Sequence, residues 1–316
     1  MNLKTDNQRG VALLATLMSI ALMTVLVIDF TYSVTAAYRS AANQMNELRA
    51  DYLARSGVQV GLALLAQDAR TDAETNQPFD SLQDVWAMPF PPVPVEGGSA
   101  GVSIIDETGK LNINLLVDQN TGVTNQIFLQ QLSRLFSLIE VPPEIIPAIV
   151  DWLDRDSVTS EGGAESDYYL GLVPPYQPRN GPMPTLGDLK MIRGVNEASF
   201  ARMRRVLTTQ PVGRPNINTA PAEVLMALSP ELANDPSIVK TLLAAREVKP
   251  LHSIADLSEV RGVSSLGAKL SALFTTKSDY FTVTGLGAFA GARKIVYASV
   301  RRNGTAPLML ANWHED

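Results

Sequence analysis

The chain of 316 residues carries 26 basic and 32 acidic side chains, a formal net charge of −6, and 46% hydrophobic residues. This composition fits one to three globular domains and excludes wholesale disorder or a collagen-like repeat. The sequence has no cysteine and two histidines, which excludes disulfides, a thiolate nucleophile and a three-histidine zinc site. The acidic balance is also unfavourable for a protein that grips nucleic acid phosphates.

An apolar segment near the amino terminus predicts a membrane-spanning helix. Eighteen residues from Val11 to Ile28 carry no charge, and a bilayer core of about 30 Å requires roughly 17–25 such residues in a helix. Lys4 and Arg9 precede the segment and Asp29 follows it. The positive-inside rule therefore places the amino terminus in the cytoplasm.

The helical pattern continues beyond the apolar segment, with apolar or small residues at steps of three and four on one face. These residues are Tyr38, Ala42, Met45, Leu48 and Tyr52. We expect one helix from Val11 to Asp68, about 87 Å long, with a transmembrane part over 11–28 and an amphipathic part over 29–70. A secretory signal peptide, the first alternative, would have a shorter apolar stretch that ends at small residues.

The leader 1–10, which ends at Gly10 and is followed directly by the helix from Val11, resembles the class III signal of type IV pilins and pseudopilins. The resemblance implies cleavage after Gly10 by a membrane peptidase and methylation of Val11. Most members carry a glutamate at the fifth mature position, where this chain has Ala15. That departure is characteristic of the K-type minor pseudopilins of type II secretion systems. An uncleaved single-pass anchor is the plain alternative.

The lost glutamate has a physical interpretation. A carboxylate in lipid is costly unless it is paired, and in pilins it is thought to pair with the amino terminus of a neighbouring subunit in the fibre. A subunit with Ala15 cannot form that pair. It therefore fits the end of the fibre, where the pair is not needed.

A small sheet is predicted on both sides of a helical region. Proline and glycine residues over 71–100 indicate a linker, followed by a strand at Gly101–Asp106 and a return strand at Leu111–Asn114. Alternation predicts further strands at Tyr280–Thr284 and Lys294–Val300. We therefore assign 71–114 and 280–316 to the sheet and its linker.

The region 115–279 between these strands is predicted to be all helical. A long helix with a small antiparallel sheet resembles the pilin core, which is an α+β fold. A large helical insertion within that sheet again resembles the K-type pseudopilin.

The insertion contains an internal repeat. The segment Thr185–Val195 matches Ser253–Val263 at an offset of 68, and an Asn-Ile-Asn element precedes each copy, at 112–114 and 216–218. Thr185 and Ser253 are expected helix N-caps with an aspartate three residues on, at Asp188 and Asp256. Gly194 and Gly262 are expected to end the helices in a left-handed conformation. The repeat divides the insertion into modules over about 112–210 and 215–279.

Such modules resemble SAM-like and helix-hairpin-helix domains, some of which bind DNA. DNA-binding hairpins usually carry a second glycine that lets backbone amides approach a phosphate. Asn196 and Ser264 stand in its place here. With the acidic charge, we expect structural modules rather than a membrane-tethered DNA-uptake protein, which remains the alternative.

An acidic loop in the first module suggests a cation site. From Glu144 to Asp167 there are seven acids and one base, and carboxylates so close repel one another unless a cation neutralises them. Oxygen ligands in a flexible loop suit calcium better than zinc. Asp154, Asp156 and Glu165 match positions 1, 3 and 12 of a calcium hand, but Val158 occupies position 5, so a true hand is not expected. A solvated acidic loop is the alternative.

The K-type resemblance implies calcium in this domain. The stretch that carries this resemblance runs over Asp151–Asp156, then 163–165 and 168–169. We take Asp151, Asp154, Asp156, Glu165 and Asp167 as candidate ligands, with Asp151 alternatively facing solvent from the preceding helix.

The resemblance covers essentially the whole chain and implies a minor pseudopilin that caps and initiates the periplasmic pseudopilus and helps export folded proteins. It implies the bacterial inner membrane, with a single span and a periplasmic body. It also implies I- and J-type minor pseudopilins, other pseudopilins, the prepilin peptidase and the inner-membrane platform as partners, and no nucleic acid. We expect no enzymatic activity, because a hydrolase built on the acidic loop would lack a nucleophile paired with a base.

Overall fold

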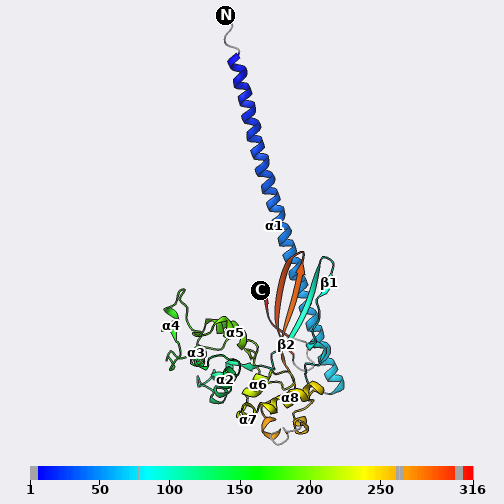
Figure 1. The fold of residues 1–316 in the computed structure, drawn as a ribbon, viewed down its shortest axis with the longest axis vertical. Helices are drawn as coiled ribbons and strands as arrows, with labels where there is room; N and C mark the ends of the chain where they lie inside the picture. The colour runs from blue at the N-terminus through cyan, green and yellow to red at the C-terminus, as the bar shows by residue number, and fades with distance from the viewer. Residues whose placement is uncertain (1–5, 77, 261–262, 264–266, 303–308, 316) are drawn as a thin grey trace.

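The computed structural model describes residues 6–76, 78–260, 263, 267–302 and 309–315. Helix α1 (Asp6–Thr75) has 70 residues and is about 105 Å long at 1.5 Å per residue. Its first half projects away from the rest of the molecule (Figure 1). The expected single helix is confirmed, but it begins at Asp6 rather than Val11 and ends at Thr75 rather than Asp68, because no proline or capping residue stops it at those points.

The lower half of α1 lies along one face of a five-stranded sheet (Figure 1). All neighbouring strands are antiparallel, in the order β1-β2-β5-β6-β7. The strands are β1 (Val93–Val95), β2 (Gly98–Asp106), β5 (Tyr280–Phe289), β6 (Ala292–Arg301) and β7 (Met309–Glu315). The long helix on a small antiparallel sheet confirms the expected α+β fold class.

The helix packs on the sheet through small residues and a compact core. Val58 and Leu65 of α1 are fully buried against Phe281 and Val283 of β5. At Gly287 the strand comes so close to the helix that an added Cβ would overlap the carbonyl oxygen of Ala50. The backbone of β5 therefore packs directly on the backbone of α1, which fixes the position of the sheet along the helix axis.

Two expectations about the strands need correction. Leu111–Asn112 does form a strand, β3, but it pairs in parallel with β4 (Leu207–Thr208) in a separate sheet and is no return strand for β2. Both edges of β2 are already occupied, by β5 and by β1, so no place is left for it. Strand β1 lies inside the expected linker; its Pro94 is tolerated because an edge strand can spare one ladder hydrogen bond.

The insertion is mainly helical and lies beside the end of the sheet that is far from the amino terminus (Figure 1). The prediction that 115–279 is all helical is wrong at Leu207–Thr208, which forms β4 because it pairs with β3. Its α-helices are α2 (Gln126–Leu138), α3 (Ile146–Leu153), α4 (Ser166–Leu170), α5 (Glu197–Met203), α6 (Ala222–Ala227), α7 (Pro230–Asn234), α8 (Pro236–Val248) and α9 (Gly267–Leu270). Short 3-10 turns are η1 (Val85–Ala87), before the insertion, and η2 (Ile113–Leu116), η3 (Pro143–Ile145), η4 (Leu186–Met191) and η5 (Ile254–Glu259) within it.

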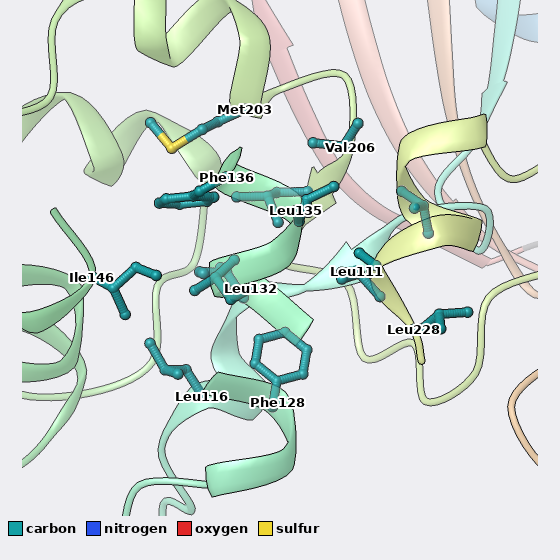
Figure 2. Close-up of a cluster of buried hydrophobic side chains, with 14 of the residues drawn as sticks. Leu111, Leu116, Phe128, Leu132, Leu135, Phe136, Ile146, Met203, Val206 and Leu228 are labelled. Atoms are coloured by element: carbon teal, nitrogen blue, oxygen red, sulfur yellow. The ribbon is translucent and has the colours of Figure 1, made fainter. Parts of the chain in front are cut away.

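One apolar core runs through both halves of the insertion. Figure 2 shows Phe128, Leu132 and Phe136 of α2 turned toward residues from both sides. Met203 and Ile146 belong to the first half, while Leu228 comes from the second. The two modules therefore share a core and are not separate bodies joined by a linker.

Buried polar contacts join the insertion to the sheet. The Asp106 carboxylate at the end of β2 accepts hydrogen bonds from the hydroxyls of Ser278 and Thr219. Arg302, which is 1% exposed, forms ion pairs with Asp68 of α1 and with the fully buried Asp80. Removing one partner of a buried ion pair leaves an unpaired buried charge, which is costly. The ion pairs of Arg302 therefore hold α1 and the linker together, and the hydrogen bonds of Asp106 hold the insertion to the sheet.

The predicted ends of the repeated helices are confirmed in part. Ser253 and Asp256 form a reciprocal capping box at η5, whereas Thr185 makes no capping hydrogen bond to the backbone of η4. Gly194 has a φ of 86°, the expected left-handed conformation. Gly262 and Ser264 lie outside the described residues.

Candidate metal site in the acidic loop

The acidic loop begins where α3 ends and finishes where α4 begins. Asp154 is the C-cap of α3 and has an extended backbone, which turns the chain out of the helix. Glu165 is the N-cap of α4, and its side chain accepts a hydrogen bond from the backbone N–H of Ser166. Two helix ends thus fix two carboxylates at the two ends of one loop.

The fold brings three predicted ligands together. One carboxylate oxygen from each of Asp154, Asp156 and Glu165 lies within 4.8 Å of the others. These are the residues that match positions 1, 3 and 12 of a calcium hand. Asp154 and Glu165 are only 7% and 3% exposed, while Asp156 is exposed. Two of the three carboxylates are therefore buried, and the third, Asp156, is open to solvent.

Two oxygens in this group are buried with no hydrogen-bond partner, Oδ1 of Asp154 and Oε1 of Glu165. Asp156 uses Oδ1 to accept the backbone N–H of Val158 at 2.7 Å. A buried acceptor without a donor costs about 1–3 kcal/mol. A bound cation would satisfy these two orphaned oxygens, and the donor set of carboxylates is the kind that calcium prefers.

The electrostatics agree with that fit. Burial, followed by repulsion from the charges of Asp156, Asp151 and Glu165, raises the pKa of Asp154 to about 7. Burial also raises the pKa of Glu165, with added repulsion from Asp151 and Asp156. A divalent cation would offset the repulsion between these carboxylates, which adds to both pKa shifts.

Asp151 does not face solvent, the alternative that the sequence left open, because it is fully buried on α3. Both of its carboxylate oxygens lie 3.2 Å from the backbone nitrogen of Ser160, which donates to them. Its place as a direct ligand stays a prediction. Its observed contact is to the loop backbone.

Asp167, the fifth candidate ligand, lies exposed in the first turn of α4 and is not part of the group of three. The processing residues are far from this site: Gly10 and Val11 lie exposed within α1, and residues 1–5 of the leader lie outside the described range.

Two residues that shape the loop, Arg193 and Asn180, carry no signal in the sequence that links them to it. The guanidinium of Arg193 donates to the carbonyl of Gly163 at 2.8 Å. Asn180 donates its side-chain amide to the carbonyl of Asp156 at 2.9 Å. Arg193 belongs to the repeated Arg-Gly-Val turn, but nothing in the repeat pairs it with the acidic loop, because the second module has no such loop.

Comparison with known proteins identifies the chain. Two family models, each described as type II secretion system protein K, match residues 109–212 and 215–277, together more than half of the chain. The chain belongs to the type II secretion system protein K family. It is therefore a minor pseudopilin, a structural component of a secretion system. The DNA-binding alternative gains no support from this family.

Individual members of the protein K family match this chain over nearly its whole length. The type II secretion system protein K of Pseudomonas aeruginosa is 28% identical over 304 residues, 93% of this chain and 89% of the relative. That of Klebsiella pneumoniae is 28% identical over 86% of this chain and 82% of the relative. The shared length includes the amino-terminal helix as well as the insertion.

A solved structure has the same fold. A chain in the crystal structure of the GspK–GspI–GspJ complex from enterotoxigenic Escherichia coli superposes with a TM-score of 0.71. It covers 88% of this chain and 99% of that chain at 18% identity. At this identity the likeness concerns the fold.

The helix from Gly10 to Thr75 is long and apolar enough to cross a membrane, which is compatible with a single-pass anchor.

Proposed function

We propose that this minor pseudopilin caps and initiates the periplasmic pseudopilus of a type II secretion system. The observation that carries the proposal is the position of the insertion. It projects beside the sheet at the end of the molecule opposite the amino terminus (Figure 1). A subunit that stacked there would meet the insertion, so the chain can end a fibre but cannot repeat along it.

Ala15 supports the same position from the other end of the molecule. It stands on the exposed first half of α1, where most pilins carry the glutamate that pairs with a neighbour. A chain without this carboxylate makes no such pair inside a fibre. We propose that the capping subunit stays in the inner membrane by a single span, with its amino terminus cytoplasmic before cleavage and its body periplasmic.

The proposed partners are the I- and J-type minor pseudopilins, since the related fold occurs in a GspK–GspI–GspJ complex. The other proposed contacts are with further pseudopilins, with the prepilin peptidase that would cut between Gly10 and Val11, and with the inner-membrane platform. The role is structural, without enzymatic activity.

We propose calcium as a structural cofactor of the acidic loop, held by Asp154, Asp156 and Glu165. The support is the pair of orphaned buried oxygens and the clustered carboxylates. When bound, calcium supplies positive charge that fixes the two ends of the loop.

Immunogold labelling of pseudopili assembled from the major subunit tests the tip position. Label at one end of each fibre is the expected result, and regular label along the fibre contradicts the proposal. In a second test, the fragment from Ser33 should form a soluble complex with the I- and J-type periplasmic fragments, with one copy of each.

A further inference from the structure

We propose that Arg193 is the positioning residue of the acidic loop and that it determines the calcium affinity of the site by holding the carbonyl of Gly163. The inference rests on the calcium site proposed above. It assigns a role to a residue outside the carboxylate cluster, contributed by the turn that follows η4.

Arg193 contacts the loop and helix α4 at three points. Its guanidinium donates to the carbonyl of Gly163 at 2.8 Å. The carbon of the guanidinium lies 5.2 Å from the centroid of the Tyr168 ring, in a cation–π contact. Its backbone N–H donates to the hydroxyl of Tyr169 at 3.3 Å. One residue therefore holds both the loop and the helix that Glu165 caps.

The other side of the loop is held by α3. Asp151 accepts the backbone N–H of Ser160, and Gly163 donates its own N–H to the carbonyl of Ser160 at 2.8 Å. A side chain at Gly163 would overlap the Asp151 carboxylate. The turn from Ser160 to Gly163 is thus pressed against α3 on one side and fixed by Arg193 on the other.

Glu165 follows Gly163 by two residues, so anchoring the Gly163 carbonyl also restrains the backbone that carries the Glu165 carboxylate. Glu165 brings an orphaned oxygen to the group that contains Asp154. Without the Arg193 hydrogen bond, the turn at Gly163 keeps only its contacts with α3. A ligating side chain that becomes ordered only when the metal binds lowers the metal affinity. Loss of outer-shell partners typically costs about 10–100-fold in metal affinity.

Whether Arg193→Gln weakens or strengthens calcium binding distinguishes a positioning role of Arg193 from a purely electrostatic one. Removing a positive charge near an acidic site strengthens calcium binding by Coulomb's law. Arg155 is the one base in the acidic stretch and is exposed, so Arg155→Gln removes the same charge close to the carboxylates. If Arg193 acted only through its charge, Arg193→Gln would also tighten binding. If it positions the loop, binding weakens.

The experiment measures calcium binding to the full chain in detergent by isothermal titration calorimetry, for the wild type, Arg193→Gln, Arg193→Lys and Arg155→Gln. We expect Arg193→Gln to weaken binding about tenfold or more, with Arg193→Lys between it and the wild type. Arg155→Gln should bind as tightly as the wild type or more tightly. Melting temperatures in chelator show whether each variant is folded, and Arg193→Lys keeps the charge if Arg193→Gln folds poorly.

Hydrogen exchange gives a second readout that a general loss of stability does not reproduce. In calcium-free protein, Arg193→Gln should speed exchange over 157–165 but leave helix α2 unchanged. Wild-type calcium affinity in Arg193→Gln, or equal weakening by Arg155→Gln, overturns the inference and leaves the calcium site standing. No calcium binding by the wild type overturns both.

Discussion

Asn218 and Leu251 are joined by two hydrogen bonds across the second module. The side-chain amide of Asn218 donates to the Leu251 carbonyl at 2.9 Å, and its side-chain oxygen accepts the Leu251 N–H at 2.9 Å. Asn114 binds the backbone of Met183 in the same way, at 2.9 and 2.8 Å. Met183 and Leu251 are 68 positions apart, the offset of the sequence repeat, so the two modules are repeats in space as well.

The Asn218 pair should carry measurable stability. Asn218 is 2% exposed, so Asn218→Leu leaves two buried backbone groups of Leu251 without partners. We expect a loss of about 2–4 kcal/mol in urea unfolding of the fragment from Ser33. Asn234→Leu, at an exposed position of the same module, is the control and should change stability little. Equal losses in the two variants would contradict the role of the hydrogen bonds.

The contact between α1 and β5 predicts strong sensitivity at Gly287. Gly287→Ala places a methyl group on the Ala50 carbonyl, and overpacking of this kind costs about 1–3 kcal/mol or more. Gly101→Ala in β2 adds the same methyl with its nearest neighbour at 3.4 Å, so it should be tolerated. Thermal unfolding compares the two; a melting temperature as low for Gly101→Ala would argue against the close approach as the cause.

Calcium should stabilise the folded protein. A ligand that binds only the folded state adds about 2.7 kcal/mol at a hundred times its dissociation constant, so the melting temperature should rise with the logarithm of calcium concentration. Asp154→Ala combined with Glu165→Ala should abolish the rise. Asp167→Ala, which alters an exposed acid outside the group of three, should retain it. An unchanged wild-type melting curve after addition of chelator would refute the site.

The raised pKa of Asp154 predicts opposite pH dependences with and without calcium. Its pKa lies at about 7 in the metal-free fold, against 3.8 when unperturbed, so the fold favours the protonated form. Its contribution to stability is fully present below about pH 3.8 and is lost as pH rises through about 7. Calcium requires the carboxylate, so calcium affinity should instead increase between pH 6 and pH 8.

Thermal unfolding in chelator and in calcium, at pH 5.5 and pH 8, measures both effects. Asp80, Asp72 and Asp106 also have raised pKa values and shift metal-free stability in the same direction. The comparison with Asp154→Asn isolates the site, since this variant should show a smaller pH dependence in chelator. Identical pH profiles for the variant and the wild type would rule out Asp154 as the group responsible.

Processing should occur between Gly10 and Val11, with methylation of Val11. Gly10→Asp puts a charged side chain at the scissile position and should leave the precursor uncut, whereas Thr5→Ala, elsewhere in the leader, should be processed normally. Intact mass spectrometry of protein from its native membrane distinguishes the forms. A mature protein that starts at any other residue contradicts this prediction.

The sequence by itself determined the features that depend on local patterns. An uncharged run of bilayer length predicted the long apolar helix, and alternation predicted the strands at 280–284 and 294–300. The repeat predicted two helical modules, and the density of carboxylates predicted the acidic loop. Each of these follows from residues close together in the chain, because hydrophobic period, capping and like-charge repulsion act over a few positions.

Only the tertiary structure decided which distant residues meet. Leu111–Asn112 has a strand pattern, but its partner is β4, 96 residues later, because β1 and β5 already flank β2. Burial turned Asp151 from a residue with two plausible orientations into a backbone anchor for Ser160. The contact of Arg193 with Gly163 spans 30 positions. No local period encodes such pairs, since they depend on how helices pack and on which polar groups packing leaves without water.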